Sequence, residues 1–442
     1  MNKFYPVDTT KVLQNMLKLF SANNSPQEVS FRDLVSWVKM GERSTHHIHS
    51  YPGKLLPQIA HFFLAAVDWL PAKCKVLDPF SGTGTVALEV MLSGKESYYS
   101  ELNPLARLIT KVKTTAIASE ALIEASEMLY LRYDLNKKNT FFPPNVTNIE
   151  HWFSKENVNE ICIVLDCIEK ESDANVKDFF KITLSSILKK VSNADERLSV
   201  PVLSKVIKAK QSVFNLFKAQ VDLNISRMAF WEECLNMQDL VTSCVGFDAR
   251  GIKQPGTWNY ELDSKIDDNC FDLTITSPPY MSAQKYIRAS SFNLEWLGLA
   301  SRKDMQELEI KNIGKERFNR QNFPLSNRTK SKQANEVIAK IEKDNILRAS
   351  IAGSYINDMT DVIAELHRVT KVNGHFVMVI GNNSVCGLEF RSSDFLSDIA
   401  QQIGFKLELE LVDNIKSRGL MTRRNKTAGI ITQEHILVFR RL

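Results

Sequence analysis

The hydrophobic pattern divides the chain into segments of two kinds. In residues 46–115, and again in 241–442, short apolar runs of strand length alternate with longer segments in which apolar residues recur every three to four positions. Strands that alternate with helices in this way predict a mostly parallel sheet with helices on both faces. The expected fold class is therefore α/β, with ligands bound along the carboxyl ends of the strands.

Two other segments depart from this alternation. Residues 1–45 have a helical apolar rhythm and predict a helical lead-in. Residues 116–240 are helical in pattern with few glycines, so we expect a helical insertion there. The last two apolar runs, at 405–412 and 435–440, are joined by a connection that is too short for a helical crossover. This connection predicts an antiparallel pair of strands at the end of the chain.

The composition sets limits on the class of protein. With 442 residues, 44% of them hydrophobic, the chain exceeds the roughly 250–300 residues at which single cores stop growing, so we expect one large domain and an insertion. The formal charge of +5 does not by itself demand a polyanionic partner. The seven cysteines contain no C-x-x-C pair, which argues against a zinc site and a disulfide framework. No apolar run approaches the ~18 residues that span a bilayer, so we expect no membrane insertion.

A glycine-rich turn follows the apolar run that ends at Asp78. In the sequence Asp-Pro-Phe-Ser-Gly-Thr-Gly, Gly82 and Gly84 let the backbone approach a ligand closely. The third glycine of G-x-G-x-x-G is absent, and no G-K-[ST] follows for a triphosphate. The next expected strand ends at Glu101, about twenty residues beyond the glycines. In this position a carboxylate can accept hydrogen bonds from both hydroxyls of a ribose. A solvated acid at a strand end is the alternative interpretation of Glu101.

A proline turn ends the apolar run of residues 271–275. The sequence is Thr276-Ser277-Pro278-Pro279-Tyr280. Neither proline has an N–H for a strand ladder, so the turn presents carbonyl acceptors between a hydroxyl and an aromatic ring. An exocyclic amino group offers two donors and therefore suits this turn. A proline-stiffened loop without a ligand is the alternative.

Two segments are basic. Residues 302–348 contain twelve Lys and Arg against seven Asp and Glu, and a shorter basic stretch lies between the last two expected strands. Segments of this kind fit a phosphate backbone, although a solvated charge run is the alternative. The candidate phosphate contacts are Arg317, Arg320, Arg328, Lys330, Lys332, Arg423 and Arg424.

Together, these motifs resemble those of the S-adenosylmethionine-dependent DNA amino-methyltransferases, which modify N4 of cytosine or N6 of adenine. The resemblance covers residues 45–115 and 240–442. It implies a Rossmann-like class I methyltransferase fold, with a mostly parallel seven-stranded sheet and an antiparallel last strand. The implied catalytic domain comprises 46–115 and 241–442, with the helical insertion 116–240 between its two parts.

The resemblance also implies a role for each matching residue, with S-adenosyl-L-methionine as cofactor. The segment Ser50-Tyr-Pro-Gly-Lys54 looks like the first cofactor segment, Glu101 matches the acid that holds the ribose hydroxyls, and Asp248 matches the acid that contacts the cofactor adenine. The implied cofactor-binding residues are Tyr51, Pro52, Lys54, Asp78, Ser81, Gly82, Gly84, Glu101 and Asp248. The implied catalytic residues are Ser277, Pro278, Pro279 and Tyr280.

The first residue of the proline turn bears on the target base. In the family a Ser in this position usually accompanies N4 of cytosine and an Asp or Asn usually accompanies adenine, so Ser277 favours cytosine. The implied activity is sequence-specific cytosine-N4 methylation of double-stranded DNA, on a base flipped out of the helix and stacked on Tyr280. Methylation of adenine N6 is the alternative, followed by an RNA amino-methyltransferase; a Rossmann dehydrogenase would require the third glycine.

The resemblance leaves the target-recognition region open between the insertion 116–240 and the basic segment 302–348. It implies a restriction-modification or epigenetic system, with a cognate restriction endonuclease as a candidate partner. We expect a protein of the bacterial cytosol or nucleoid that uses no metal.

Overall fold

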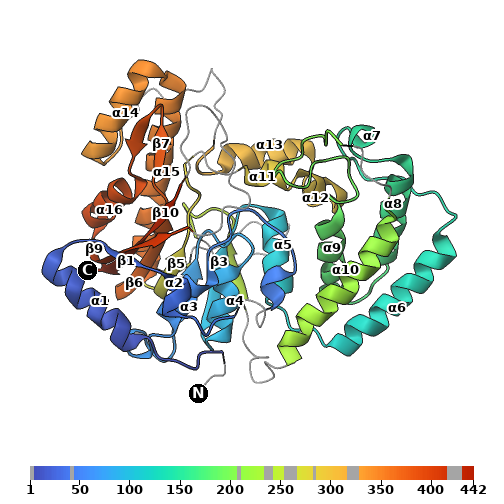
Figure 1. Ribbon diagram of the computed structural model, residues 1–442, viewed down its shortest axis with the longest axis horizontal. Helices are drawn as coiled ribbons and strands as arrows, with labels where there is room; N and C mark the ends of the chain where they lie inside the picture. Colours follow the sequence, from blue (N-terminus) through green and yellow to red (C-terminus); the bar gives the residue numbers. More distant parts are fainter. Residues whose placement is uncertain are drawn as a thin grey trace.

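The computed structural model describes residues 4–39, 44–206, 211–232, 242–252, 266–281, 285–315, 328–415 and 431–442. These residues form a central sheet with helices packed on it and a group of helices beside it (Figure 1). Among them, no helix has both the length and the apolar character that crossing a membrane would require.

The sheet has eight described strands in the order β1-β9-β10-β6-β5-β2-β3-β4. Strand β10 runs antiparallel to both of its neighbours, β6 and β9, and all other neighbouring pairs are parallel. The bounds are β1 Gln27–Val29, β2 Lys75–Asp78, β3 Glu96–Ser100, β4 Thr242–Gly246, β5 Phe271–Thr276, β6 Thr370–Ile380, β9 Phe405–Asn414 and β10 Gln433–Arg441. The expected α/β fold, with its mostly parallel sheet and antiparallel last strand, is confirmed.

Strand β1 brings the sheet to one strand more than the expected seven. It lies in the N-terminal segment for which the apolar pattern predicts helices, and it pairs parallel with β9 at the edge of the sheet. A strand of three residues is too short to produce a recognisable alternation, because the pattern needs about four to eight positions. Helices flank it on both sides, namely α1 Thr10–Asn23 and α2 Phe31–Leu34.

Each face of the sheet is buried under its own set of helices. Successive side chains of a strand point to opposite faces, and in β6 Val377 belongs to one apolar core while Met378 belongs to the other. The core that contains Val377 is covered by α1, α2, α3 Pro57–Leu64 and α4 Thr85–Leu92. The core that contains Met378 is covered by α14 Lys332–Asp344, α15 Ile346–Val369 and α16 Ser392–Ile403, next to the small hairpin β7 Asn383–Val385 and β8 Leu388–Phe390.

A third apolar core holds the helices that lie between β3 and β4 in the chain. They are α5 Pro104–Lys113, α6 Ser119–Asn136, α7 Ile149–Trp152, α8 Lys155–Glu169, α9 Ala174–Ile187 and α10 Val213–Met228. Helices α11 Tyr286–Ala289, α12 Ser291–Trp296 and α13 Arg302–Lys311 follow β5 and pack on them, as the upper right of Figure 1 shows. Asn293 donates its side-chain amide to the carbonyl of Ser185 at 2.7 Å, which joins α12 to α9. The helical region is thus attached to the segment that follows the proline turn.

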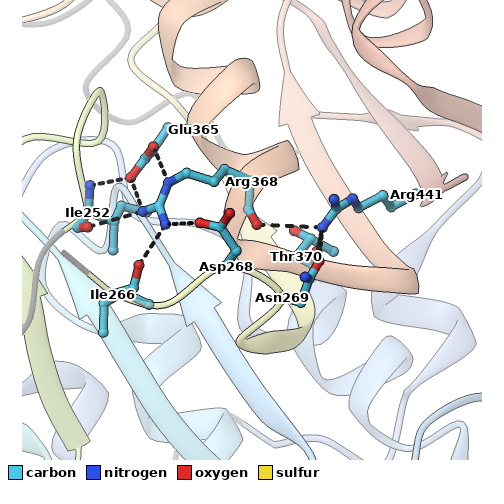
Figure 2. Close-up of polar contacts among 8 residues, drawn as sticks. All are labelled: Ile252, Ile266, Asp268, Asn269, Glu365, Arg368, Thr370 and Arg441. Atoms are coloured by element: carbon cyan, nitrogen blue, oxygen red, sulfur yellow. Dashed lines mark hydrogen bonds and ion pairs between the residues drawn. The ribbon is translucent and has the colours of Figure 1, made fainter.

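Helix α15 fixes the two chain positions on either side of residues 253–265, which lie outside the described part of the chain (Figure 2). Arg368 donates to the carbonyl of Ile266 at 2.6 Å, and Glu365 accepts from the N–H of Ile252 at 2.8 Å. The two side chains also pair with each other, at 2.7 Å between the guanidinium and the carboxylate. One ion pair on α15 therefore holds both positions.

Candidate active site

A cleft lies where β2, β3, β4 and β5 end. Each of these parallel strands contributes wall residues from the turn that follows it, as expected for a ligand site at the carboxyl edge of an α/β sheet. Of the residues singled out from the sequence, the wall contains Tyr51, Gly82, Glu101, Asp248, Ser277 and Pro279. Motifs that lie up to about 230 positions apart in the chain therefore meet at one place.

The turn after β2 requires a glycine at its end. Gly84 has a φ of +70° and precedes α4. A Cβ atom built on Gly84 would lie 2.6 Å from Cγ2 of Thr110, on the neighbouring helix α5. The neighbouring Gly82 contributes to the cleft wall, and its carbonyl accepts from the hydroxyl of Thr110 at 3.2 Å. Close packing of α5 against the turn thus explains the second glycine of the motif.

Glu101 is held rigidly on the wall of the cleft. Its Oε2 accepts from the N–H of Gly82 and its Oε1 accepts from the N–H of Asn103, both at 2.8 Å. Burial raises the pKa of this carboxyl to about 7, although both backbone N–H groups oppose the rise. A carboxylate has about four acceptor positions, so each oxygen keeps one for a ligand.

Asp78 joins the glycine turn to the proline turn. Its Oδ1 accepts from the hydroxyl of Thr276 at 2.7 Å and from the N–H of Phe80 at 3.1 Å. Burial raises the pKa of Asp78 to about 7, and these two hydrogen bonds act in the opposite direction. Asp78 is not part of the cleft wall, and the structure gives it the position of a link between two loops. A direct contact of Asp78 with the cofactor stays a prediction.

Asn103 organises one side of the cleft, and the sequence analysis missed it. Its Nδ2 donates to the hydroxyls of Tyr51 and Ser290, each at 3.0 Å, and its Oδ1 accepts from the N–H of Leu105 at 3.1 Å. The last of these bonds caps the N-terminus of α5. The signal was present, because Asn followed by Pro is typical of a helix start. Tyr51 also stacks on Tyr286 of α11, with 6.2 Å between ring centroids.

Asp248 already has a partner on the wall of the cleft. Arg250 binds both carboxylate oxygens, with 3.0 Å from Nε to Oδ1 and 2.7 Å from the terminal nitrogen to Oδ2. The same guanidinium pairs with Asp358 of α15 at 2.7 Å and donates to the carbonyl of Lys311 at 2.9 Å. Arg250 therefore connects three parts of the cleft surroundings. The contact of Asp248 with a cofactor adenine stays a prediction.

The proline turn places Ser277 and Pro279 on the wall, while the ring of Tyr280 has other contacts. The Tyr280 hydroxyl donates to Oε1 of Glu434 on β10 at 2.8 Å, and the Ser277 hydroxyl lies 3.5 Å from it. A Cβ atom on Gly381, at the end of β6, would come within 3.0 Å of the Tyr280 ring. Stacking of a base on Tyr280 stays a prediction, as does the catalytic role of Pro278, which is buried.

The expected first cofactor segment, residues 50–54, folds back on the residues before it. Lys54 donates its ammonium to the carbonyls of His46 and His49, at 3.1 and 2.7 Å. His46 in turn contacts the buried carboxylate of Glu89 at 3.1 Å. Neither Lys54 nor Pro52 belongs to the cleft wall, so their part in cofactor binding stays a prediction. Within the described ranges, no group of three or more His, Cys, Asp or Glu side chains is arranged to hold a metal ion.

The candidate DNA contacts divide into two groups. Arg317, Arg320, Arg423 and Arg424 lie outside the residues that the structure describes. Arg328, Lys330 and Lys332 are exposed at the start of α14 and just before it. Contact with DNA stays a prediction for all of them.

Comparison with known proteins gives relatives along most of the chain. No protein-family model matches it. It is 24% identical to the Type II methyltransferase M.MvaI of Kocuria varians over 423 residues, covering 90% of this chain and 91% of that protein. It is 26% identical to the Type II methyltransferase M.BsoBI of Geobacillus stearothermophilus (85% and 81% covered), and 25% to M.AvaI of Nostoc sp. (76% and 74%). A TehB-like SAM-dependent methyltransferase from Corynebacterium glutamicum covers 98% of both chains at 10% identity, with a TM-score of 0.27, too low to support an argument.

Proposed function

We propose that this chain, which is similar over most of its length to Type II methyltransferases, methylates DNA on an exocyclic amino group. The observation that carries the proposal is the meeting of Glu101 and Gly82 with Ser277 and Pro279 around one cleft. Glu101 and Gly82 suit a methyl donor that contains a nucleoside, whereas the turn with Ser277 and Pro279 suits an amino group. The cofactor is S-adenosylmethionine.

The cleft offers donor and acceptor groups that suit this cofactor. The free acceptor positions of Glu101 suit the two ribose hydroxyls. The buried hydroxyl oxygen of Ser81, in the glycine turn, has no hydrogen-bond partner among the described residues, but Ser81 is not part of the cleft wall, so its contact with the cofactor stays a prediction. Asp248 and Tyr51 complete the proposed set on the wall.

The proline turn would prepare the amino group for reaction. The amine nitrogen is a poor nucleophile because its lone pair is delocalised into the base. In the proposed mechanism its two N–H groups donate to the hydroxyl oxygen of Ser277 and to the carbonyl of Pro278, which favours a pyramidal nitrogen with a localised lone pair. The bound cofactor supplies an electrophilic methyl group. Catalysis then depends on the positions of the acceptors, and a strong base is not needed before attack.

The target base must leave the DNA helix to reach this cleft. Enzymes that modify a base atom inside a duplex flip the nucleotide out, at an unstacking cost of a few kcal/mol. The exposed basic side chains Lys330 and Lys332 would hold the DNA backbone during this step. The Type II names of the relatives favour a restriction-modification role, and a partner endonuclease stays a prediction.

We further propose N4 of cytosine as the target atom, because Ser277 leads the proline turn. The test is to methylate plasmid DNA with the purified protein, digest the DNA to nucleosides and identify the product by mass spectrometry. N4-methylcytosine is the expected product. N6-methyladenine would correct the base and leave the mechanism, whereas 5-methylcytosine would contradict the mechanism, because attack at ring carbon requires a nucleophilic cysteine. As a control, Ser277→Ala should react roughly 10–10³-fold more slowly, the range for one lost transition-state hydrogen bond.

A further inference from the structure

One side chain on the cleft wall and two behind it form a line of hydroxyl and carboxyl groups. Ser277 is on the wall, its Oγ lies 3.5 Å from the Tyr280 hydroxyl, and that hydroxyl lies 2.8 Å from Oε1 of Glu434. Tyr280 and Glu434 are not among the residues of the wall. Glu434 comes from the antiparallel strand β10, which lies between β9 and β6 in the sheet. It is 154 positions after Tyr280 in the chain.

The chemistry of these groups sets the direction of the hydrogen bonds. An ionised carboxylate can only accept, so the hydroxyl hydrogen of Tyr280 must point to Glu434. The Tyr280 oxygen is then left as an acceptor for the hydroxyl hydrogen of Ser277. The first bond has an ordinary length for two oxygens, and the second, at 3.5 Å, is long and weaker. Ser277, with its hydrogen turned away from the cleft, presents only lone pairs there.

We propose that Glu434 is a positioning residue that commits Ser277 to act as a hydrogen-bond acceptor in the cleft. A free serine hydroxyl can both donate and accept, so by itself it does not distinguish an amino group from a carbonyl oxygen. A serine that can only accept favours the amino group of cytosine or adenine over the carbonyl oxygen of the corresponding deaminated base. Glu434 therefore contributes to specificity through Tyr280. This inference rests on the proposed function.

The surroundings of Glu434 support this arrangement. The absence of a side chain on Gly381 gives the Tyr280 ring room to reach the carboxylate, since a Cβ atom there would lie 3.0 Å from the ring. The charged groups near the Glu434 carboxylate are Asp413, opposite it on β9, and Arg32 of α2. Burial raises the pKa of Glu434, while the hydrogen bond from Tyr280 opposes the rise. The test is therefore run at mildly alkaline pH, which favours the ionised carboxylate.

The central variant is Glu434→Gln. The glutamine has the same size, but its NH₂ group can donate to Tyr280, which frees the hydroxyls of Tyr280 and Ser277 to turn round. We expect the single-turnover rate of methyl transfer to fall about 2–10-fold, the range for one ordinary hydrogen bond. The dissociation constant for S-adenosylmethionine should not change. The matched control is Glu408→Gln on the neighbouring strand β9, whose carboxylate pairs with Arg440 at 2.7 Å.

The specificity readout uses the target duplex identified by plasmid methylation. DNA affinity is measured with the target cytosine present and with uracil in its place; for an adenine target, hypoxanthine replaces adenine. The wild type should prefer the amino base, and Glu434→Gln should reduce that preference. Tyr280→Phe, which removes the middle hydroxyl, should reduce it in the same way. Adding Glu434→Gln to Tyr280→Phe should then have no further effect, because the line is already broken.

The outcomes separate this inference from the proposed function. An active wild type whose rate and base preference are unaffected by Glu434→Gln would overturn the inference alone, as would additive effects in the double variant. An inactive wild type would overturn both. Melting temperatures are recorded for every variant. If Glu434→Gln does not fold, the base preference of Tyr280→Phe tests the inference, and an unchanged preference would overturn it.

Discussion

The hydroxyl of Thr276 donates to the carboxylate of Asp78, with 2.7 Å between Oγ1 and Oδ1, and both side chains are buried. Asp78 ends β2 and Thr276 ends the adjacent strand β5. This one hydrogen bond therefore connects the glycine turn and the proline turn, so the two halves of the candidate active site share a common support.

Thr276→Val should destabilise the protein by about 1–3 kcal/mol, because it leaves a buried carboxyl oxygen without one of its donors. Thr274 offers a matched control on the same strand, since its hydroxyl is buried and has no partner among the described residues. Thr274→Val should leave stability unchanged or raise it. Denaturant unfolding of the two variants measures both effects, and equal losses would contradict the role assigned to the Thr276 bond.

Glu101→Gln should weaken S-adenosylmethionine binding about 10–100-fold, as expected when a hydrogen-bond acceptor loses its charge. Isothermal titration calorimetry measures the affinity directly. Glu96→Gln, at the exposed start of the same strand, is the control and should bind like the wild type. Wild-type affinity in Glu101→Gln would contradict the proposed role of Glu101 in cofactor binding.

The affinity for S-adenosylmethionine should fall as the pH is lowered through about 7. The pKa of Glu101 is raised to about 7, mainly by burial, so the carboxylate that accepts the ribose hydroxyls becomes protonated below that pH. Calorimetry over a pH series measures the effect. Glu101→Gln should bind more weakly and lose most of the pH dependence, and an equally steep dependence in that variant would assign the titration to another group.

The contribution of Asp78 and Glu101 to the free energy of unfolding of the ligand-free protein should have the opposite dependence on pH. Both have folded pKa values of about 7, above the ordinary 3.8 and 4.5. Between these values each carboxyl binds more protons in the folded state than in the unfolded state, so its contribution to stability decreases as the pH rises from about 4 to 7. Buried histidines such as His46, whose pKa is lowered to about 4, act in the other direction, so denaturant unfolding compares the wild type with Glu101→Gln. The stability of the wild type relative to this variant should fall over the range, and a rise would contradict the sign.

Gly381→Ala should displace the Tyr280 ring and slow methyl transfer while leaving cofactor affinity nearly intact. An added Cβ atom would lie 2.6 Å from Cγ2 of Ile431 and 3.0 Å from the ring, so one of the two must move. Single-turnover kinetics and calorimetry separate the two effects. Gly251→Ala is the control, because no atom of the described residues lies within 4 Å of its added Cβ atom.

Replacing Lys330 and Lys332 by Ala should weaken DNA binding on every sequence. If each lysine lies on a phosphate, each replacement should also reduce the salt dependence of binding by about one counterion. Fluorescence anisotropy at several salt concentrations measures both quantities. Lys406→Ala, exposed at the amino end of β9, is the control. Unchanged DNA binding at moderate salt would mean that Lys330 and Lys332 are solvated surface residues that do not contact DNA.

Much of the site could be predicted because each of its motifs lies directly after a strand. Gly82, Glu101 and Ser277 each follow an apolar run, and the carboxyl ends of parallel strands meet at one edge of a sheet, so their convergence follows from the pattern. Asn103 was within reach for the same reason, as a helix cap next to Glu101.

Other contacts could not be predicted, because they depend on how distant elements pack. Nothing in the sequence around Glu434 connects it with Tyr280, since their contact requires β10 to lie within the sheet in one particular register. Gly381 reads as an ordinary turn glycine, and its importance depends on the ring that packs against it. Tyr286 reaches Tyr51 through the short helix α11, for which the apolar pattern gives no position.

The clamp that Arg368 and Glu365 form on α15 has a consequence for how this protein can change during evolution or engineering. The N–H of Ile266 also donates to the carbonyl of Ile252 at 3.3 Å, so the two positions that flank residues 253–265 are held next to each other. With the ends held, doubling the length of the chain between them adds only about 0.6 kcal/mol of closure entropy. Ile252 and Ile266 therefore mark a place where extra residues, such as a reporter peptide, can be added at a small entropic cost.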